Sequence, residues 1–339
     1  MTDPIRVFVL TQSPIPNPLL EMLRAVSHRL SVTHRTAHSL DELGDDAWRG
    51  VEVLYTTGLM PPPELAPDLR WVQGHFAGVD SVIEHPLLKR VTLTTASGIH
   101  APAMGEYILM MMLAFAHHLP RMIQYYRQAE WPRERWALFA PQELRGSTVG
   151  IAGYGSIGRE VARLAHAFGM RVLATKRDLS HTADGGWQLP EVGDPSAGHV
   201  DRLFTSDALL DMLGECDYVV VSLPLTSETR GLIDAEALKR MKPGAVLINI
   251  SRGGVIDEAA LIDALRAGTI GGAALDVFER EPLPASSPLW GLPNVILSPH
   301  VSGFTLRYDE RAMALFADNL RRYLAGEELL NEVDLQRGY

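Results

Sequence analysis

Short apolar runs recur along the whole chain, in two sets separated by a long apolar segment. The first set predicts strands at 5–10, 51–55, 70–73 and 91–94, and the second predicts strands at 149–152, 172–175, 218–222, 245–249, 273–276 and 295–297. Segments with apolar residues at helical spacing lie between these runs. Such alternation of strands and helices is typical of α/β proteins with parallel sheets. We therefore expect parallel α/β architecture from end to end.

Three segments have a clear helical pattern, at 18–26, 102–127 and 306–324. Methionine and leucine occupy several faces of the second segment, which predicts one long helix in the middle of the chain. The stretch 180–200 instead contains many Gly, Pro, Asp and Ser residues without periodicity. That composition predicts a mobile insertion at the surface.

A glycine-rich turn, Gly153-Tyr154-Gly155-Ser156-Ile157-Gly158, connects the first strand of the second set to a helical segment. The pattern G-x-G-x-x-G between a strand and a helix indicates dinucleotide binding. Gly153 permits the tight turn, Gly155 lets the backbone approach a pyrophosphate, and Gly158 lets the helix pack against the strand. The N-terminus of the helix attracts the phosphate charge. The alternative interpretation is a tight turn that binds no ligand.

The position of this turn predicts how the chain is divided. A length of 339 residues favours about two domains, and the turn opens the second strand set rather than the first. The residues after 301 are too few for a third domain, so we expect them to return to the first one. The predicted domains are 1–100 together with 303–339, and 101–302, with a cleft between them.

Composition limits the kinds of partner. The formal net charge of −10, from 31 basic and 41 acidic residues, gives no reason to expect nucleic acid or an anionic membrane. The single cysteine, Cys216, cannot form an intrachain disulfide and has no partners for a metal cluster. We therefore expect a buried structural thiol and no metal. The chain has no signal-peptide pattern and no run of about 18 apolar residues, which predicts a cytoplasmic protein.

Three polar side chains stand in the loops after the last three predicted strands, namely Arg252, Glu281 and His300. Because the carboxyl ends of parallel strands meet at one edge of a sheet, we expect these side chains to lie close together. A histidine can take a proton from an alcohol, and a carboxylate behind it orients the ring. An arginine can bind a carboxylate through two parallel hydrogen bonds. With a nicotinamide as hydride acceptor, this set suits the oxidation of a hydroxyacid or the reverse reaction.

Each of these residues also has a simpler interpretation. Arg252 is compatible with a surface charge beside the helix that begins near 257, and Glu281 with a solvated loop acid. His300 is one of 12 histidines and is compatible with a structural role. Their occurrence together at equivalent sheet positions favours the catalytic interpretation.

Several segments resemble, in the right order, motifs of the D-isomer specific 2-hydroxyacid dehydrogenase family. They lie at 144–158, 221–226, 249–258, 274–283 and 298–300, and the resemblance runs from about Trp71 to Tyr323. It implies an α/β protein with two doubly wound parallel-sheet domains, a Rossmann-type nucleotide-binding domain and a discontinuous, flavodoxin-like substrate domain. It also implies an oxidoreductase that interconverts a D-2-hydroxyacid and its 2-oxoacid with NAD(P).

The resemblance assigns roles to individual residues. Arg252 anchors the substrate carboxylate and carbonyl, His300 is the acid/base, and Glu281 is its partner. The residues expected to bind the cofactor are Gly153, Gly155, Ser156, Ile157, Gly158, Leu223, Pro224, Ile250, Ser251 and Asp276, of which Asp276 would hold the nicotinamide carboxamide. The residues expected to bind substrate, besides Arg252 and His300, are His75, Phe76, Ala77 and Gly78. His100 stands where the family often has asparagine, and its role is open.

The choice between NAD(H) and NADP(H) depends on the residues at the end of the strand predicted at 172–175. An acid there accepts hydrogen bonds from the ribose hydroxyls of NAD. This chain has Lys176 at that position, followed by Arg177. Two cations attract a 2′-phosphate, which favours NADP(H) over NAD(H). Two alternatives remain open: Asp178 restores a contact of the NAD type, or both cations point to solvent.

These observations predict a 2-oxoacid reductase of the glyoxylate or hydroxypyruvate type. The alternatives are a phosphite- or phosphoglycerate-type dehydrogenase and a non-enzymatic NAD(P)-sensing protein that resembles a corepressor. Formate oxidation is disfavoured, because the formate branch normally has glutamine where Glu281 stands. The family's two-fold dimer is formed with a helix like the one that contains Met110, Met111, Met112 and Leu113, so we expect a homodimer.

Overall fold

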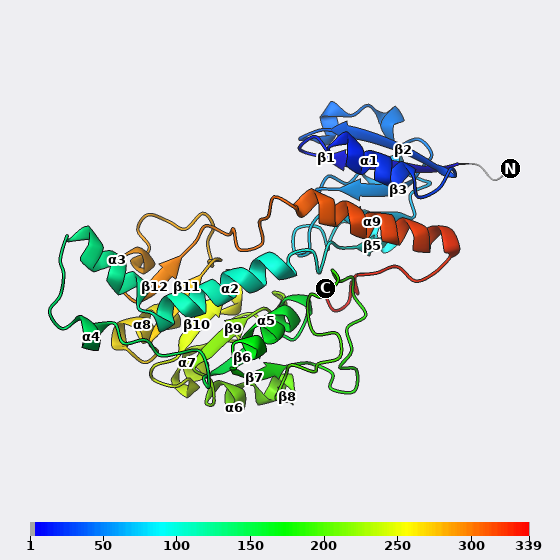
Figure 1. The fold of residues 1–339 in the computed structure, drawn as a ribbon. Coiled ribbons are helices and arrows are strands. Elements are labelled where there is room, and N and C mark those ends of the chain that lie inside the picture. Colours follow the sequence, from blue (N-terminus) through cyan, green and yellow to red (C-terminus); the bar gives the residue numbers. More distant parts are fainter. Residues whose placement is uncertain (1–3, 339) are drawn as a thin grey trace. The chain divides into compact units, whose positions relative to one another are not determined.

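The computed structural model describes residues 4–338. Within this range the chain forms two compact units. Unit 1 comprises residues 4–99, 185–189 and 305–338, and unit 2 comprises residues 100–184 and 190–304. Each unit has its own sheet, and Figure 1 shows strands β1 to β5 in one unit and β6 to β12 in the other.

Unit 1 contains a five-stranded parallel sheet in the order β2-β1-β3-β4-β5, which is the flavodoxin order. Its strands are β1 (Ile5–Thr11), β2 (Leu30–Thr36), β3 (Val51–Thr56), β4 (Trp71–Gly74) and β5 (Thr92–Thr94). The helices are α1 (Asn17–Arg24) and α9 (Tyr308–Ala325), with 3₁₀ turns η1 (Leu40–Glu42), η2 (Asp45–Trp48), η3 (Pro63–Leu65) and η4 (Pro86–Lys89).

Both faces of this sheet are buried because successive residues of a strand point to opposite sides. Val7 and Val9 of β1 pack in a cluster with Phe316 of α9, whereas Phe8 and Leu10 pack in a second cluster on the other face. This alternation explains why the strands appear in the sequence as continuous apolar runs.

Unit 2 contains a seven-stranded parallel sheet in the order β12-β11-β10-β9-β6-β7-β8. The strands are β6 (Thr148–Ala152), β7 (Arg171–Thr175), β8 (Arg202–Phe204), β9 (Tyr218–Val221), β10 (Val246–Asn249), β11 (Gly272–Leu275) and β12 (Val295–Leu297). Counted from β6, this is the Rossmann order 3-2-1-4-5-6 with one strand added. The direction of the winding reverses between β6 and β9, where such sheets bind ligands.

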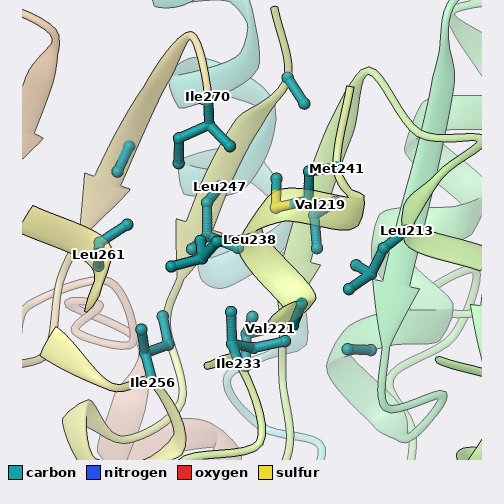
Figure 2. Close-up of a cluster of buried hydrophobic side chains, with 14 of the residues drawn as sticks. Leu213, Val219, Val221, Ile233, Leu238, Met241, Leu247, Ile256, Leu261 and Ile270 are labelled. Atoms are coloured by element: carbon teal, nitrogen blue, oxygen red, sulfur yellow. The ribbon is translucent and has the colours of Figure 1, made fainter. Parts of the chain in front are cut away.

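Helices cover both faces of this sheet. They are α2 (Ala101–Ala116), α3 (Leu119–Arg127), α4 (Arg135–Leu138), α5 (Ser156–Ala167), α6 (Leu209–Leu213), α7 (Ala235–Arg240) and α8 (Glu258–Ala267), with 3₁₀ turns η5 (Ser206–Ala208), η6 (Gly253–Val255) and η7 (Pro288–Gly291). Figure 2 shows one face, where Val219 and Leu247 of the sheet lie in one buried cluster with Leu238 of α7. Val220 and Ile248 point to the other face, which α2 and α5 cover. The two sheets confirm the predicted fold class.

The predicted helix 102–127 is wrong in one respect, because the structure divides it into α2 and α3. Pro120 lies in the first turn of α3 and has no amide hydrogen to donate. Its ring would clash with the carbonyl four residues earlier, at Ala116, which is where α2 ends. His118, the residue before α3, has a left-handed φ of 56°, which also interrupts the helix. The strands β2 and β8 were not predicted from the sequence.

The expectation of a mobile insertion at the surface for 180–200 is wrong for its two buried anchors. Trp187 packs in unit 1 with Ala96 and Leu315, and its indole N–H donates to Asp318 at 3.0 Å. Asp194 is 98% buried in unit 2. The many small and polar residues around Trp187 and Asp194 are typical of a surface loop, so composition alone does not predict that these two side chains are buried.

Candidate functional site

The glycine turn lies at the point where the winding of the unit 2 sheet reverses, between β6 and α5. Gly153 has a left-handed φ of 103°, and a side chain there would meet the Ser222 carbonyl. A Cβ on Gly158 would lie 2.4 Å from the Gly153 carbonyl oxygen, so the turn cannot hold a larger residue at either position. A Cβ on Gly155 would meet no atom within 4 Å. The backbone at the start of α5 is therefore open to an approaching phosphate group, and the turn fits a dinucleotide.

The other residues expected to bind the cofactor lie on the loops around this turn. Ser156 and Ile157 begin α5, Leu223 and Pro224 follow β9, and Ile250 and Ser251 follow β10. Leu223 lies against the turn, since its side chain would be 3.0 Å from a Cβ on Gly153. The Ser251 hydroxyl donates to Asn249 at 2.8 Å, which fixes the loop after β10.

Glu281 and His300 are in direct contact. The His300 Nδ1 atom lies 2.7 Å from Oε2 of Glu281, and the backbone N–H of Phe278 donates to Oε1 at 3.0 Å. A carboxylate only accepts hydrogen bonds, so Nδ1 carries the proton and Nε2 can exchange a proton with a ligand. The side chains are 49% and 35% exposed for His300 and Glu281, so this pair is accessible to a small molecule.

The backbone of His300 has an unusual conformation, with a left-handed φ of 55°. Such a conformation costs about 1–3 kcal/mol for a residue other than glycine unless neighbouring contacts compensate. The carbonyl of Asp276 accepts the His300 N–H at 2.8 Å, and its carboxylate accepts the N–H groups of Val301 at 2.8 Å and Ser302 at 2.9 Å. Asp276 is fully buried and therefore holds the loop that carries His300.

A chain of hydrogen bonds extends from Asp276 to α2. The Ser298 hydroxyl donates to Oδ1 of Asp276 at 2.6 Å, and the Tyr107 hydroxyl lies 2.6 Å from the Ser298 oxygen. Because the single proton of Ser298 goes to the carboxylate, Tyr107 must donate to Ser298. Burial raises the pKa of Tyr107 to about 12, so the phenol keeps its proton. The apolar pattern of the helix gave no signal for this role of Tyr107.

Arg252 lies at the N-cap of η6, on the loop after β10, and one of its terminal nitrogens donates to the Ser251 carbonyl at 2.8 Å. A Cβ on the next residue, Gly253, would lie 1.9 Å from the carbonyl carbon of Phe278. The Arg252 turn is therefore packed directly on the start of the loop that carries Glu281. His100, at the start of α2, contacts the carbonyl of Gly303 through Nδ1 at 3.3 Å.

The end of β7 carries the predicted cations. Lys176 is half-buried, and burial together with the charge of Arg159 lowers its pKa. Arg177 pairs with Glu228 at 2.8 Å, an exposed contact of the kind that contributes about 0–1 kcal/mol. The Asp178 carboxylate accepts hydrogen bonds from the backbone N–H and the hydroxyl of Ser180 at 2.8 and 2.6 Å, which lower its pKa.

The predicted substrate loop belongs to unit 1 and follows β4. The Tyr55 hydroxyl and His75 Nδ1 are 2.5 Å apart, and the Tyr308 hydroxyl donates to the His75 carbonyl at 2.7 Å. The His75 ring lies 4.6 Å from the Tyr308 ring, and Nε2 is 3.6 Å from Asp309. Burial raises the pKa of Tyr55 well above its usual value. His75 is thus held from several sides, while Phe76, Ala77 and Gly78 follow it with partly exposed side chains or backbone.

Fold and site together define a protein with a Rossmann-type dinucleotide unit and a histidine–carboxylate pair at the carboxyl edge of its sheet. Residues 109–302 match the family described as D-isomer specific 2-hydroxyacid dehydrogenase, NAD binding domain. The chain belongs to this family.

Similar proteins include a glyoxylate reductase of Pyrococcus furiosus, 36% identical over 78% of this chain and 75% of the relative. An (S)-sulfolactate dehydrogenase of Chromohalobacter salexigens is 38% identical over 76% of this chain and 78% of the relative. Among solved structures, a D-isomer specific 2-hydroxyacid dehydrogenase from Xanthobacter autotrophicus Py2, in complex with NADPH and MES, matches all of both chains at 32% identity with a TM-score of 0.81. In residues 4–338, no helix has the length and apolar character needed to span a membrane.

Proposed function

We propose that this protein is an NAD(P)-dependent reductase that converts small 2-oxoacids to D-2-hydroxyacids. The observation that carries the proposal is the 2.7 Å contact between Nδ1 of His300 and Glu281, which joins loops from neighbouring strands. The names of the similar reductase and dehydrogenases support the same class of reaction.

The roles follow from the geometry of the side chains. The Glu281 carboxylate accepts a hydrogen bond from Nδ1–H and stabilises the imidazolium form of His300, which donates its Nε2 proton to the carbonyl oxygen of the substrate and becomes neutral. Arg252 binds the substrate carboxylate through its guanidinium, which also fixes the orientation of the carbonyl. When bound, the nicotinamide supplies the hydride. Asp276 keeps the His300 loop in its strained conformation, and its contact with the carboxamide stays a prediction.

The two units have separate tasks in this proposal. Unit 2 binds the cofactor at the glycine turn, with Leu223, Pro224, Ile250 and Ser251 on the neighbouring loops. Unit 1 binds the substrate carboxylate through the backbone of His75, Phe76, Ala77 and Gly78. In terms of the predicted domains, we assign the first task to 101–302 and the second to 1–100 with 303–339.

A steady-state screen tests the reaction. Glyoxylate, hydroxypyruvate and larger 2-oxoacids are offered with NADPH and with NADH, and oxidation of the cofactor is followed by absorbance. We expect turnover with at least one 2-oxoacid, and a kcat at least about 10²-fold lower with the His300→Asn variant. Cofactor binding without turnover of any 2-oxoacid would indicate a sensor instead, and turnover of phosphite or 3-phosphoglycerate alone would indicate another branch of the family.

The proposed cofactor is NADP(H) in preference to NAD(H). Lys176 and Arg177 stand at the end of β7, and Asp178 accepts hydrogen bonds within its own loop from Ser180. The relative from X. autotrophicus was solved with NADPH. Because the contact between Arg177 and Glu228 is exposed, recruiting the guanidinium to a phosphate costs little.

Neutral replacements test this preference. In the Lys176→Gln/Arg177→Gln double variant, the KM for NADPH should rise by roughly tenfold or more, since hydrogen bonds to charged groups contribute about 1.5–3 kcal/mol. The KM for NADH should change much less. Equal changes in the two constants would contradict the assignment of NADP(H).

We also propose that the protein is a cytoplasmic homodimer. Three aromatic side chains of the α3–α4 segment are exposed: Tyr126 of α3 at 84%, Trp131 of the connecting loop at 82% and Trp136 of α4 at 78%. Figure 1 shows that a long loop connects the two helices. Exposed aromatic residues are enriched at protein interfaces. On α2, Met110 is exposed whereas Met111 and Met112 are buried within the chain. Light scattering should give twice the chain mass, and Trp131→Ser/Trp136→Ser should shift it toward the monomer.

A further inference from the structure

Arg159, the residue directly after the glycine turn, is almost completely buried although it carries a charge. Its relative exposure is 1%. One terminal nitrogen donates to the carbonyl of Thr182 and the other to the carbonyl of Asp194, both at 2.5 Å, and Nε lies 3.4 Å from Oδ2 of Asp184. Burial of a guanidinium is unfavourable unless its donors are satisfied. Here the donors engage two stretches of unit 2 that come after β7, namely 182–184 and 194.

Tyr154, the residue between the first two glycines of the turn, completes this network. The Arg159 guanidinium lies 4.6 Å above the Tyr154 ring, and the Tyr154 hydroxyl donates to Oδ2 of Asp194 at 2.5 Å. Asp194 also accepts the N–H groups of Gly198 and His199 at 2.7 and 2.9 Å. Burial raises the pKa of Tyr154 well above its usual value, so the phenol stays a donor. The glycine turn, α5 and the chain after β7 are therefore joined through one buried cluster.

The next residue of α5 adds a second attachment. Glu160 is 2% exposed, and its carboxylate accepts the Gly193 N–H at 2.7 Å. It also pairs with Arg163, one turn further along the helix, at 2.5 Å. The Arg163 side chain is 34% exposed, in contrast to the buried Arg159. The same helix thus carries one buried arginine that bonds to Thr182 and Asp194 and one partly exposed arginine that pairs with Glu160.

The buried cluster fixes the chain that follows Lys176 and Arg177. The backbone N–H of Lys176 donates to Phe204 of β8, which fixes the first end of the stretch. Arg159 holds the second end at Thr182 and Asp184, only a few residues later. The loop of Asp178 with Ser180 is confined between these two ends, and its carboxylate accepts hydrogen bonds there. His181 Nδ1 also lies 2.8 Å from Oδ2 of Asp178, so the carboxylate is turned into its own loop.

We propose that Arg159 is a positioning residue for the 2′-phosphate pocket: by holding Thr182, Asp184 and Asp194, it keeps Lys176 and Arg177 in place for the phosphate and Asp178 turned into its own loop. The residue selects NADP(H) over NAD(H) without contacting the phosphate itself. This inference rests on the proposed preference for NADP(H), and it adds a buried determinant to the surface cations.

The test compares Arg159→Lys with Arg163→Lys as the matched control on the same helix. Lysine keeps the charge but cannot bridge three acceptors in one plane, as a guanidinium does. The dissociation constants of NADPH and NADH are measured by fluorescence titration, together with kcat at saturating cofactor. For Arg159→Lys we expect about tenfold weaker NADPH binding and less than twofold change for NADH, with kcat within twofold. Arg163→Lys should change neither constant beyond twofold.

A second variant keeps the proposal testable if Arg159→Lys does not fold, which thermal denaturation would reveal. Tyr154→Phe removes only the hydroxyl that binds Asp194 and leaves the ring beneath the guanidinium. It should weaken NADPH binding about threefold and leave NADH binding unchanged.

The outcomes separate this inference from the proposed function. Equal weakening of NADPH and NADH, or no change in either, would overturn the role of Arg159 while the cofactor preference of the wild type stands. A wild-type protein that binds both cofactors equally would overturn the cofactor preference and this inference together, while leaving the 2-oxoacid reductase activity intact.

Discussion

Two loop regions of unit 2 are built in different ways. The catalytic loops after β11 and β12 are held by carboxylates that belong to these same loops: Glu281 accepts the Phe278 N–H, and Asp276 accepts the N–H groups of Val301 and Ser302. The stretch after β7 is held by Arg159 of α5 and Tyr154 of the glycine turn, which bond to Thr182 and Asp194. The reacting groups are therefore positioned by carboxylates of their own loops, whereas the chain that we propose distinguishes the cofactors is positioned by buried side chains of the glycine turn and α5.

This difference determines what a substitution should do. Changes in the catalytic loops should lower turnover and leave cofactor selectivity unchanged. Changes in the buried cluster around Arg159 should have the opposite pattern. Three further experiments test the catalytic half of the comparison, in order of decreasing effect, and a fourth probes a position outside both loop regions.

The largest effect is expected for His300→Asn. Asparagine tolerates the left-handed backbone that His300 adopts, so the loop should keep its path. Loss of the acid/base group should lower kcat by about 10²- to 10⁴-fold. NADPH titration serves as the control and should give the wild-type dissociation constant. An activity within threefold of the wild type would remove His300 from the mechanism.

Glu281→Gln should also lower kcat strongly, but less than His300→Asn, because the imidazole remains. The glutamine amide can still accept the Phe278 N–H, but it provides no charge beside Nδ1. We expect a lower kcat with an unchanged ratio of the KM values for NADPH and NADH. A change in that ratio would show that the two loop regions are not independent.

Tyr107→Phe tests the hydrogen-bond chain that supports Asp276. Tyr107→Phe removes one hydrogen bond, which contributes about 1 kcal/mol. If the activation free energy rises by that amount, kcat should decrease roughly fivefold. The KM for NADPH should be unaffected, since Tyr107 lies on α2 and not in the Arg159 cluster. The neighbouring exposed residue Glu106 offers a control as Glu106→Gln, which should match the wild type.

Cys216 provides a position away from both loop regions, and we expect no effect there. The thiol is fully buried, donates to the Met212 carbonyl at 3.0 Å, and has its pKa raised by burial to about 12. Because the thiolate is the reactive form, the native protein should not react with a thiol reagent at pH 8. One thiol should react after unfolding in denaturant. Rapid labelling of the native protein would mean that this part of unit 2 opens readily.

Much of the fold was predictable because buried parallel strands appear as apolar runs. The missed strands are explained by their residues. In β2, Ser31 and Thr33 alternate with the buried Leu30 and Val32, a period-two signal weaker than a continuous run. β8 has only three residues, at the edge of its sheet. The break between α2 and α3 could have been predicted from Pro120 alone.

The sequence by itself determined the chemistry: a glycine turn between strand and helix, and an arginine, an acid and a histidine after consecutive strands. These features are local, because residue type and distance from a strand end decide where such side chains lie. The tertiary structure alone decided how the loops are held. A buried guanidinium bonds to whichever carbonyl groups the packed chain brings within reach, and no spacing in the sequence specifies that Arg159 meets Thr182 and Asp194. The same holds for Tyr107 and Ser298, which are 191 positions apart and meet only because α2 packs on the sheet.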